Sequence, residues 1–285
     1  MPALKSTIPL PRRHVAAALL FQSKMLIASW NVNSVKARLL NLLAWLEKAK
    51  PDIVGLQELK CVDEAFPRAE IEALGYNVET FGQKTYNGVA LLSRYRLEDV
   101  TRGIPGFEDE HSRYIEAVVS TSAGALRVAS LYLPNGNPVD SPKYPYKLAW
   151  MTAFEKHAVS LMQNEEAFVL AGDYNAIPSP QDVHAPDAWE GDALYRPETR
   201  EAFRRLVNLG LTEAVGTLTT TGPDTYTFWD YQGGAWPKNK GIRIDHHLLS
   251  PLAADRLVNV RIDKHTRDWE KPSDHVPVLI ELDMA

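Results

Sequence analysis

Short hydrophobic runs recur along the whole chain and are separated by polar segments that contain Gly, Pro, Asn or Asp. Runs of this kind, bounded by turn-forming residues, are typical of buried β-strands. We therefore predict strands over residues 26–30, 53–56, 89–93, 114–120, 126–133, 168–171, 226–229, 242–249 and 276–282.

A second pattern, with apolar positions three or four residues apart, predicts helices over residues 35–46, 66–74, 146–162 and 198–209. Asn33 and Ser34 are suited to cap the first helix, and Pro51 ends it. The strands between residues 89 and 133 follow one another over short connections, which favours antiparallel pairing. Residues 230–241, rich in Gly, Lys and Trp, form a long loop between two strands, as functional loops often do.

Polar side chains come directly after several of these strands, most clearly in the stretch from Phe168 to Asn175. Asp173 and Asn175 are two positions apart, so both would lie on one side of the chain as it leaves the strand. A carboxylate and an amide fixed there suit a metal ion or a phosphoryl oxygen, but the same residues are also common in turns. Similar endings occur at Asn31, Asn33, Gln57, Glu58, Asn135, Asp245, His246, Asp274 and His275.

Composition and length indicate one globular unit. The chain has 285 residues, of which 45% are hydrophobic, and no Gly/Ser linker or low-complexity block divides it. We therefore expect a single domain over residues 25–285. Residues 1–24 contain Arg12-Arg13 and an apolar stretch without a clear signal-peptide cleavage site, and we expect them to be a disordered or non-native extension.

Cysteine usage and charge narrow the class of protein. A single cysteine, Cys61, excludes an internal disulfide and a multi-cysteine metal cluster, which favours a reducing, cytoplasmic compartment. No hydrophobic run approaches the ~18 residues needed to span a bilayer. The net charge of -5 does not exclude a nucleic-acid partner, because acidic metal ligands lower the total while basic loops set the local field.

Taken in order, the polar strand endings resemble the exonuclease III family of abasic-site endonucleases, within the endonuclease, exonuclease and phosphatase superfamily. The resemblance runs from Met25 to about Asp283. It rests on the motifs Ser29–Arg38, Leu56–Lys60, Gly88–Ser93, Tyr132–Gly136, Gly172–Asn175, Gly241–Asp245 and Ser273–His275. It implies an α/β fold, a four-layered sandwich of two packed mixed or antiparallel sheets flanked by helices, with the site at one end.

The resemblance also implies a role for each residue that matches a motif. Glu58 would be the main metal carboxylate, and Asp245 would orient His275, which contacts phosphate. The implied metal ligands are Asn31, Glu58, Asp173, Asn175, Asp274 and His275. The implied catalytic residues are Tyr132, Asp173, Asn175, Asp245 and His275.

The chemistry of these side chains agrees with phosphodiester hydrolysis. Oxygen ligands without thiols favour Mg²⁺, with Mn²⁺ as a substitute, over zinc. The reaction needs an oriented water and stabilisation of charge on the phosphoryl oxygens. The sequence leaves open whether Asp173 or His275 is the general base. Asn33, where some relatives have an aspartate, weakens the case for a second tightly held metal.

The expected partner is double-stranded DNA with abasic sites or blocked 3′ ends, bound by a monomer without contact to a membrane. The sequence leaves open how incision at abasic sites and 3′-end processing are balanced. The competing classes are a superfamily phosphatase acting on phosphoinositide or sphingolipid, and a DNA or protein binder that has lost catalysis. The candidate DNA contacts are Lys143, Lys147, Phe228, Trp236, Lys238, Lys240, Ile242 and Ile244. The lysines would hold phosphates, Phe228, Ile242 and Ile244 would form an apolar pocket for the base-free sugar, and Trp236 would insert as a wedge into the vacated base stack.

Overall fold

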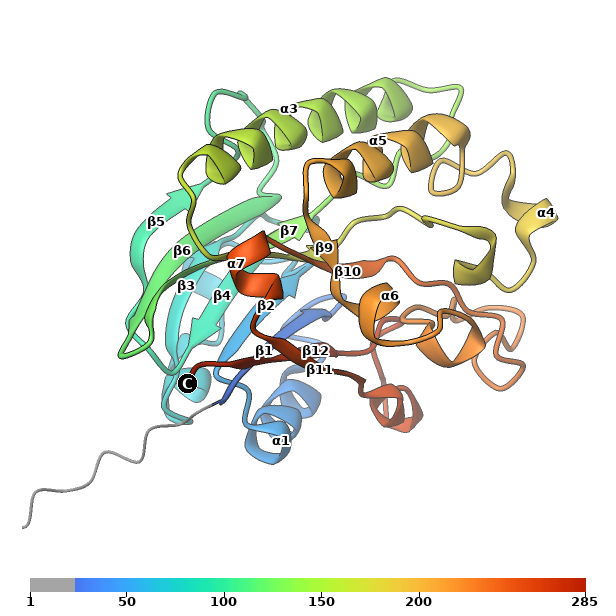
Figure 1. Ribbon diagram of the computed structural model, residues 1–285. Helices are drawn as coiled ribbons and strands as arrows, with labels where there is room; N and C mark the ends of the chain where they lie inside the picture. Colours follow the sequence, from blue (N-terminus) through green and yellow to red (C-terminus); the bar gives the residue numbers. More distant parts are fainter. Residues whose placement is uncertain (1–23) are drawn as a thin grey trace, which may run out of the picture.

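The computed structural model describes residues 24–285 (Figure 1). The predicted extension over residues 1–24 lies outside this part, except for its last residue. Lys24 begins the first strand, pairs in register with Asp283 and makes an ion pair with Glu281. The folded domain therefore starts one residue before Met25, the residue at which the domain was predicted to begin.

Within residues 24–285, twelve strands form two six-stranded sheets. The strands are β1 (Lys24–Asn31), β2 (Ile53–Gln57), β3 (Asn77–Phe81), β4 (Val89–Ser93), β5 (Glu98–Arg102), β6 (Tyr114–Thr121), β7 (Gly124–Tyr132), β8 (Phe168–Asp173), β9 (Thr212–Glu213), β10 (Asp245–Leu249), β11 (Leu257–Ile262) and β12 (Val278–Asp283). Their orders are β11-β12-β1-β2-β4-β3 in the first sheet and β5-β6-β7-β8-β10-β9 in the second. Both sheets are mixed, because β1 pairs with β2 and β7 pairs with β8 in parallel, while the other pairs are antiparallel.

Helices cover the outer faces of both sheets, which gives the predicted four layers (Figure 1). They are α1 (Leu39–Ala49), α2 (Arg68–Glu72), α3 (Lys143–Gln163), α4 (Pro186–Trp189), α5 (Pro197–Asn208), α6 (Ala214–Leu218) and α7 (Pro251–Ala254). Helices α3 and α5 pack on the second sheet, where Phe154 and Phe203 contact the strand residue Leu170 in one cluster. Helix α1 packs on the first sheet, where Trp45 lies edge-on to Trp30.

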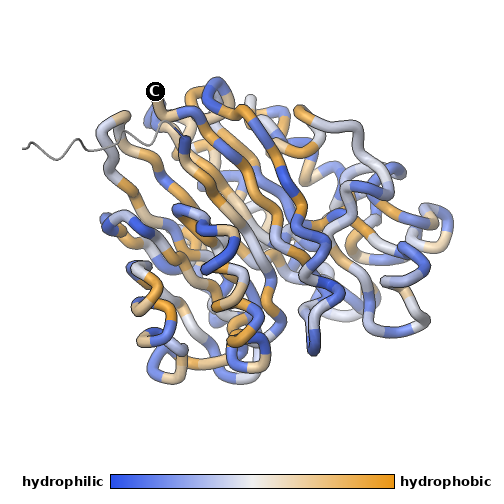
Figure 2. The backbone as a smooth tube through the Cα atoms, turned by 90° about the horizontal axis from the view of Figure 1, so that it is seen from below, coloured by the Kyte–Doolittle hydropathy of each residue, from blue (hydrophilic) through white to orange (hydrophobic). Residues whose placement is uncertain are grey.

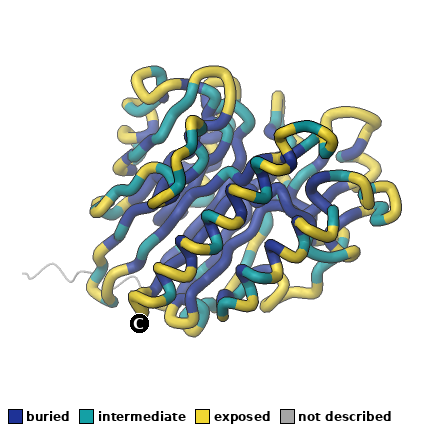
Figure 3. The backbone as a smooth tube through the Cα atoms, turned by 90° about the horizontal axis from the view of Figure 1, so that it is seen from above, coloured by how far each residue is buried: buried dark blue, intermediate teal, exposed yellow. Residues whose placement is uncertain are grey.

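Burial follows these layers. A third hydrophobic cluster lies between the sheets and includes Ile27, Ile53, Val169, Leu249 and Ile280. The strands contain long hydrophobic stretches (Figure 2). Figure 3, which shows the opposite side of the molecule, shows that the strands are buried beneath helices whose outer faces are exposed. No helix in residues 24–285 is long and apolar enough to cross a membrane.

Several predicted strands differ from those observed. Residues 226–229 form no strand, because Phe228 makes only isolated bridges to Ile242 and His275. Strand β10 accordingly begins at Asp245 and not at Ile242. The antiparallel pairing of β6 with β7 is confirmed, but β4 lies in the other sheet, between β2 and β3. Strands β3, β5, β9 and β11 were not predicted.

The predicted cap of the first helix is also wrong. Asn33 and Ser34 have positive φ angles of 44° and 87°, and the backbone N–H groups of Ser34 and Val35 donate to the carbonyls of Glu58 and Leu59. These bonds tie the segment to the end of β2, so α1 begins only at Leu39. In contrast, α3 begins at Lys143, earlier than the predicted residue 146.

Candidate active site

The polar strand endings meet at one end of the sandwich, where both sheets contribute. The parallel pair β1–β2 ends next to Asn31 and Glu58, and the parallel pair β7–β8 ends at Tyr132 and Asp173, which face each other in register. Asp245 opens β10 and pairs in register with Asp173. Because parallel strands end on the same side of a sheet and the antiparallel β10 begins there, this topology collects side chains from five separate parts of the chain.

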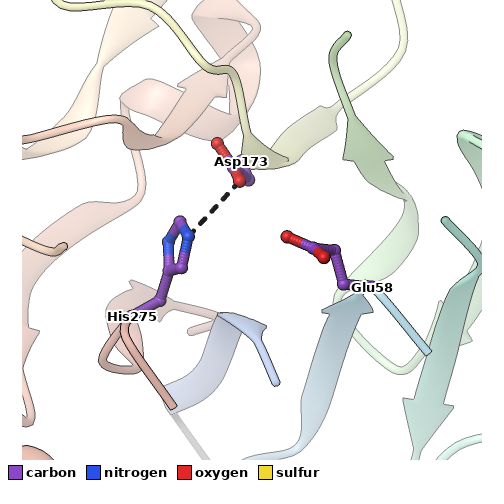
Figure 4. A group of neighbouring side chains, drawn as sticks. All are labelled: Glu58, Asp173 and His275. Atoms are coloured by element: carbon purple, nitrogen blue, oxygen red, sulfur yellow. Dashed lines mark ion pairs between the residues drawn. The ribbon is translucent and has the colours of Figure 1, made fainter. Parts of the chain in front are cut away.

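A cluster of three titratable groups forms the centre of this end. Glu58, Asp173 and His275 each offer one ligand atom, and these atoms lie within 4.8 Å of one another (Figure 4). The amide nitrogen of Asn31 donates to Glu58 Oε1 and to Asp173 Oδ2, both at 2.9 Å. Asn31 thus turns its NH₂ group toward the carboxylates and orients them, whereas a metal ligand would offer its amide oxygen.

Glu58 is held ionised by its neighbours. Burial opposes ionisation, but Lys60, whose Nζ lies 2.9 Å from Glu58 Oε2, and the hydrogen bond from Asn31 outweigh it and lower the pKa of Glu58. Lys60 also donates to Asn33 Oδ1. The carboxylate is therefore charged and ready to bind a cation at neutral pH.

His275 is fixed between two carboxylates. Its Nδ1 lies 2.9 Å from Asp245 Oδ2, its Nε2 lies 3.6 Å from Asp173 Oδ2, and Thr227 Oγ1 donates to Asp245 at 2.6 Å. Burial alone would lower the pKa of His275, but Asp245 and Asp173 outweigh it and raise this pKa to about 10. The imidazole is thus protonated and aligned as a donor, in the geometry predicted for the Asp245–His275 pair.

Burial disfavours the ionised form of two further groups of the site, Asp173 and Tyr132. Burial raises the pKa of Asp173 to about 7, with His275 opposing and Asp245 adding to this shift. Burial, together with the charges of Glu58 and Asp173, raises the pKa of Tyr132 well above its usual value. Tyr132 therefore keeps its proton and is a hydrogen-bond donor.

A pocket of about 260 Å³ opens over this cluster. Its lining includes every predicted catalytic residue except the fully buried Asp245, and also Asp274, whose Oδ1 accepts a hydrogen bond from Asn33. Phe228 forms part of one wall and contacts His275 edge-on at 4.9 Å between ring centres. The lining residues are Glu58, Tyr132, Asn135, Asn137, Asp173, Asn175, Trp189, Asp192, Leu194, Phe228, Asp230, Ile242, Ile244, Asp274 and His275.

Sequence reasoning missed part of this pocket. Trp189 and Leu194 line it but follow no strand and belong to no motif, so the sequence carried no local signal for them. Asn135 is contained in a motif and was given no role, although its amide nitrogen donates to Asn175 Oδ1 at 3.0 Å. Thr227 was likewise missed, because a lone threonine in a loop has no distinguishing pattern.

The predicted DNA-contacting residues fall into two groups. Lys143, Lys238 and Lys240 are exposed, and Lys143 borders a neighbouring pocket of about 470 Å³ that shares Tyr132 with the first. Lys147 is fully buried, and its Nζ donates to the backbone carbonyls of Asn135 at 3.0 Å and Asn175 at 2.6 Å. The prediction that Lys147 grips DNA phosphates is therefore wrong.

Burial has a second consequence for Lys147. It lowers the pKa of the ammonium to about 7, with Asp192 and Asp173 opposing this shift.

Trp236 also differs from the prediction: it does not line the pocket, its ring packs edge-on against Trp229, and its indole N–H donates to Asp268 at 2.7 Å. These contacts do not support a wedge inserted into DNA.

Comparison with known proteins agrees with this geometry. Residues 28–275 match the model of the Endonuclease/Exonuclease/phosphatase family. The chain is 36% identical over 266 residues to exodeoxyribonuclease III of Haemophilus influenzae, covering 90% of this chain and all of that protein. It is 30% identical to the DNA repair nuclease APEX1 of Danio rerio, covering 91% of this chain and 83% of that protein.

Solved structures give the same result. The 3′ phosphatase NExo from Neisseria, bound to a product DNA hairpin, superimposes with a TM-score of 0.87 at 39% identity, covering 91% of this chain and 99% of that one. An AP endonuclease from Archaeoglobus fulgidus gives a TM-score of 0.84 at 34% identity, with the same coverage of 91% and 99%. This chain therefore belongs to the endonuclease/exonuclease/phosphatase family.

Proposed function

We propose that this protein is a Mg²⁺-dependent DNA repair nuclease of exonuclease III type, which cleaves phosphodiesters 5′ to abasic sites and processes blocked 3′ ends. The observation that carries the proposal is the cluster of Glu58, Asp173 and His275, which places two carboxylates for a cation and a protonated imidazole for a phosphate within 4.8 Å of one another at the floor of a pocket. The relatives named exodeoxyribonuclease III and AP endonuclease support this reading, since this chain covers nearly all of each.

The donor set fits a hard divalent cation. The carboxylates of Glu58 and Asp173 converge, Asp274 lines the same pocket, and no thiol lines it. Asn175 also lines the pocket, but its Oδ1 already accepts a hydrogen bond from Asn135, so it is not part of the cation's donor set. Mg²⁺ typically uses one or two carboxylates and keeps several waters, and Mn²⁺ accepts the same ligands. When bound there, the cation supplies positive charge that stabilises the phosphoryl oxygens. We propose one tightly held ion, because Asn33, which stands where some relatives have an aspartate, offers no carboxylate and instead donates from its amide nitrogen to Asp274 Oδ1.

We assign each role in hydrolysis to a residue of this chain. His275 donates from Nε2 to a phosphoryl oxygen, and Asp245 holds its other nitrogen so that the imidazole stays protonated. Tyr132 donates a hydrogen bond from its phenol O–H to the same phosphate. Asp173, fixed by Asn31 and aligned toward the pocket, orients the attacking water and accepts its proton. The water oxygen bonds to phosphorus as the bond from phosphorus to the leaving 3′ oxygen breaks, and that oxygen takes a proton from solvent. We therefore favour Asp173 over His275 as the general base.

Selection of abasic DNA would come from the pocket wall. A base-free sugar costs a few kcal/mol less to flip out than a paired nucleotide, and it fits a small apolar pocket that excludes a base. Phe228 is partly exposed, whereas Ile242 and Ile244 are nearly fully buried behind it, so Phe228 is the main contact we propose. Lys143, Lys238 and Lys240 would hold phosphates without regard to sequence.

The proposed nuclease function also bears on the domain, the oligomeric state, the compartment and the two competing function classes. We take residues 25–285 as one catalytic domain that acts as a monomer in the cytoplasm. The competing phosphatase reading lacks support from the apolar wall of the pocket, which suits a flipped sugar. The non-catalytic reading conflicts with the retention of Glu58, Asp173, Asn175, Asp245 and His275 together in one place.

The test compares substrates under controlled metal. Purified protein is incubated with an abasic duplex, an intact duplex, a duplex with a 3′-phosphate and a phosphoinositide, with Mg²⁺ or with EDTA. We expect cleavage 5′ to the abasic site and removal of the 3′-phosphate, both only with Mg²⁺. Hydrolysis of the phosphoinositide alone, or DNA cleavage in EDTA at the same rate, would overturn the proposal.

A further inference from the structure

Lys147 is an ionisable side chain at a place that normally excludes charge. It lies in α3, is fully buried, and its stem packs so closely on Gly136 that a Cβ there would come within 2.7 Å of Lys147 Cδ. Burying an ammonium is costly unless hydrogen bonds compensate. Its Nζ donates to two backbone carbonyls, those of Asn135 and Asn175, which belong to different loops.

These two loops carry much of the active site. The first continues from Tyr132 at the end of β7, and the second continues from Asp173 at the end of β8. They are joined further by side chains: the amide nitrogen of Asn135 donates to Asn175 Oδ1 at 3.0 Å, and the amide nitrogen of Asn175 donates to the carbonyl of Leu133 at 2.8 Å. Each of these NH₂ groups keeps one hydrogen for a ligand in the pocket, which both residues line.

The backbone at Asn175 requires such support. Its φ angle is 44°, in the left-handed region, which asparagine adopts more readily than most residues but less readily than glycine, so neighbouring contacts help to fix it. The bond from Lys147 to the Asn175 carbonyl, at 2.6 Å, acts directly on this residue. Releasing it would let the Asn175 amide rotate away from the reacting phosphate.

We propose that Lys147 is a positioning residue for hydrolysis: it ties the loop of Asn135 to the loop of Asn175 and so aims both amides into the pocket. It touches no substrate and acts only through these residues. This inference rests on the proposed nuclease function and adds to it a residue outside the cluster of Glu58, Asp173 and His275.

The test uses Lys147→Met, which keeps a long stem and removes the donors, and Lys147→Gln, which keeps one NH₂ group. Met151→Ala is the matched control, because Met151 is buried on the same helix one turn away and packs in the core. The single-turnover rate on an abasic duplex, the Kd for that duplex and the melting temperature are measured for each variant. Amide exchange of residues 133–137 and 174–176 is followed in parallel.

We expect Lys147→Met to lose roughly 10²-fold in single-turnover rate with the Kd almost unchanged, since small misplacements of reacting groups have effects of this size. Lys147→Gln should lose less, Met151→Ala should lower only the melting temperature, and exchange should rise in both loops only for the lysine variants. In an Asn175→Ala background, Lys147→Met should cost little more, because both changes disable one unit.

The outcomes separate cleanly. The proposal is overturned if the lysine variants cleave as fast as Met151→Ala, if their loss lies in Kd alone, or if the losses of Lys147→Met and Asn175→Ala multiply. If Lys147→Met does not fold, Lys147→Gln decides by the same criteria. If the wild-type protein cleaves no DNA, the proposed nuclease function fails. The positioning role is then tested by amide exchange alone, and it is overturned if exchange in the two loops is no faster in the lysine variants than in the wild type.

Discussion

His247 should make the protein sensitive to acid, and the size of the effect can be worked out from its surroundings. This side chain lies in β10, is fully buried, and neither ring nitrogen has a hydrogen-bond partner among residues 24–285. Burial lowers its pKa from 6.5 to about 4. Between the two pKa values, the unfolded chain therefore binds a proton at His247 that the folded protein does not bind. The free energy of unfolding is highest above the pKa of the unfolded state and decreases as the pH falls below it.

The shift from 6.5 to about 4 sets the magnitude. Between about pH 8 and about pH 5, this one group should lower the free energy of unfolding by about 2 kcal/mol, and by somewhat more than 3 kcal/mol below the folded pKa. Other groups also titrate over this range, so the effect must be isolated by comparison. His247→Leu removes the titrating ring and keeps a side chain of similar size in the core.

The assay is urea unfolding of wild type and His247→Leu at about pH 8 and about pH 5. At the higher pH the two proteins should have similar stability, because replacing an unpaired buried polar ring by an apolar side chain is close to neutral. At the lower pH the wild type should be the less stable by about 2 kcal/mol. Equal losses in both proteins would show that His247 does not titrate as reasoned.

Three further predictions concern the site. Glu58→Ala should require far more Mg²⁺ for cleavage and recover in part at high metal; an unchanged metal titration would contradict its role as a ligand. His275→Ala and Asp245→Ala should each lose activity, and the double variant should lose little more, because the pair acts as one unit; losses that multiply would separate them. Phe228→Ala should reduce discrimination between abasic and intact duplex more than it reduces the melting temperature, whereas Lys238→Ala should weaken binding of both substrates and flatten the salt dependence.

The sequence predicted the buried strands and the residues at their ends, because both leave local signals. A continuous apolar run such as residues 168–171 indicates a strand, and the polar residue that follows it marks the edge of a sheet. Edge strands lack this signal. In β5, the residues of Glu98–Arg102 are all at least partly exposed, and β11 is similarly open, so neither has an apolar run that could reveal it.

Other features depend on contacts between distant parts of the chain. Thr227 reaches Asp245, and Trp189 reaches the pocket, only because the fold brings them there. Lys147 is a different case. It lies on the same helical face as Tyr144, Trp150 and Phe154, at spacings of three and four residues, so the sequence did contain the signal that it is buried. We nevertheless predicted that Lys147 contacts DNA, because the residue is charged and lies near other basic residues.

The central claim is that Asp173 performs chemistry at a metal-dependent site and does not merely hold DNA. The most direct measurement is single-turnover cleavage of an abasic duplex with Mg²⁺ by wild type and Asp173→Asn, with the Kd of each protein for the same duplex. We expect a loss of roughly 10²-fold or more in rate with DNA binding retained, because a general base is removed. An Asp173→Asn protein that cleaves at the wild-type rate, or that fails only because it no longer binds DNA, would contradict it.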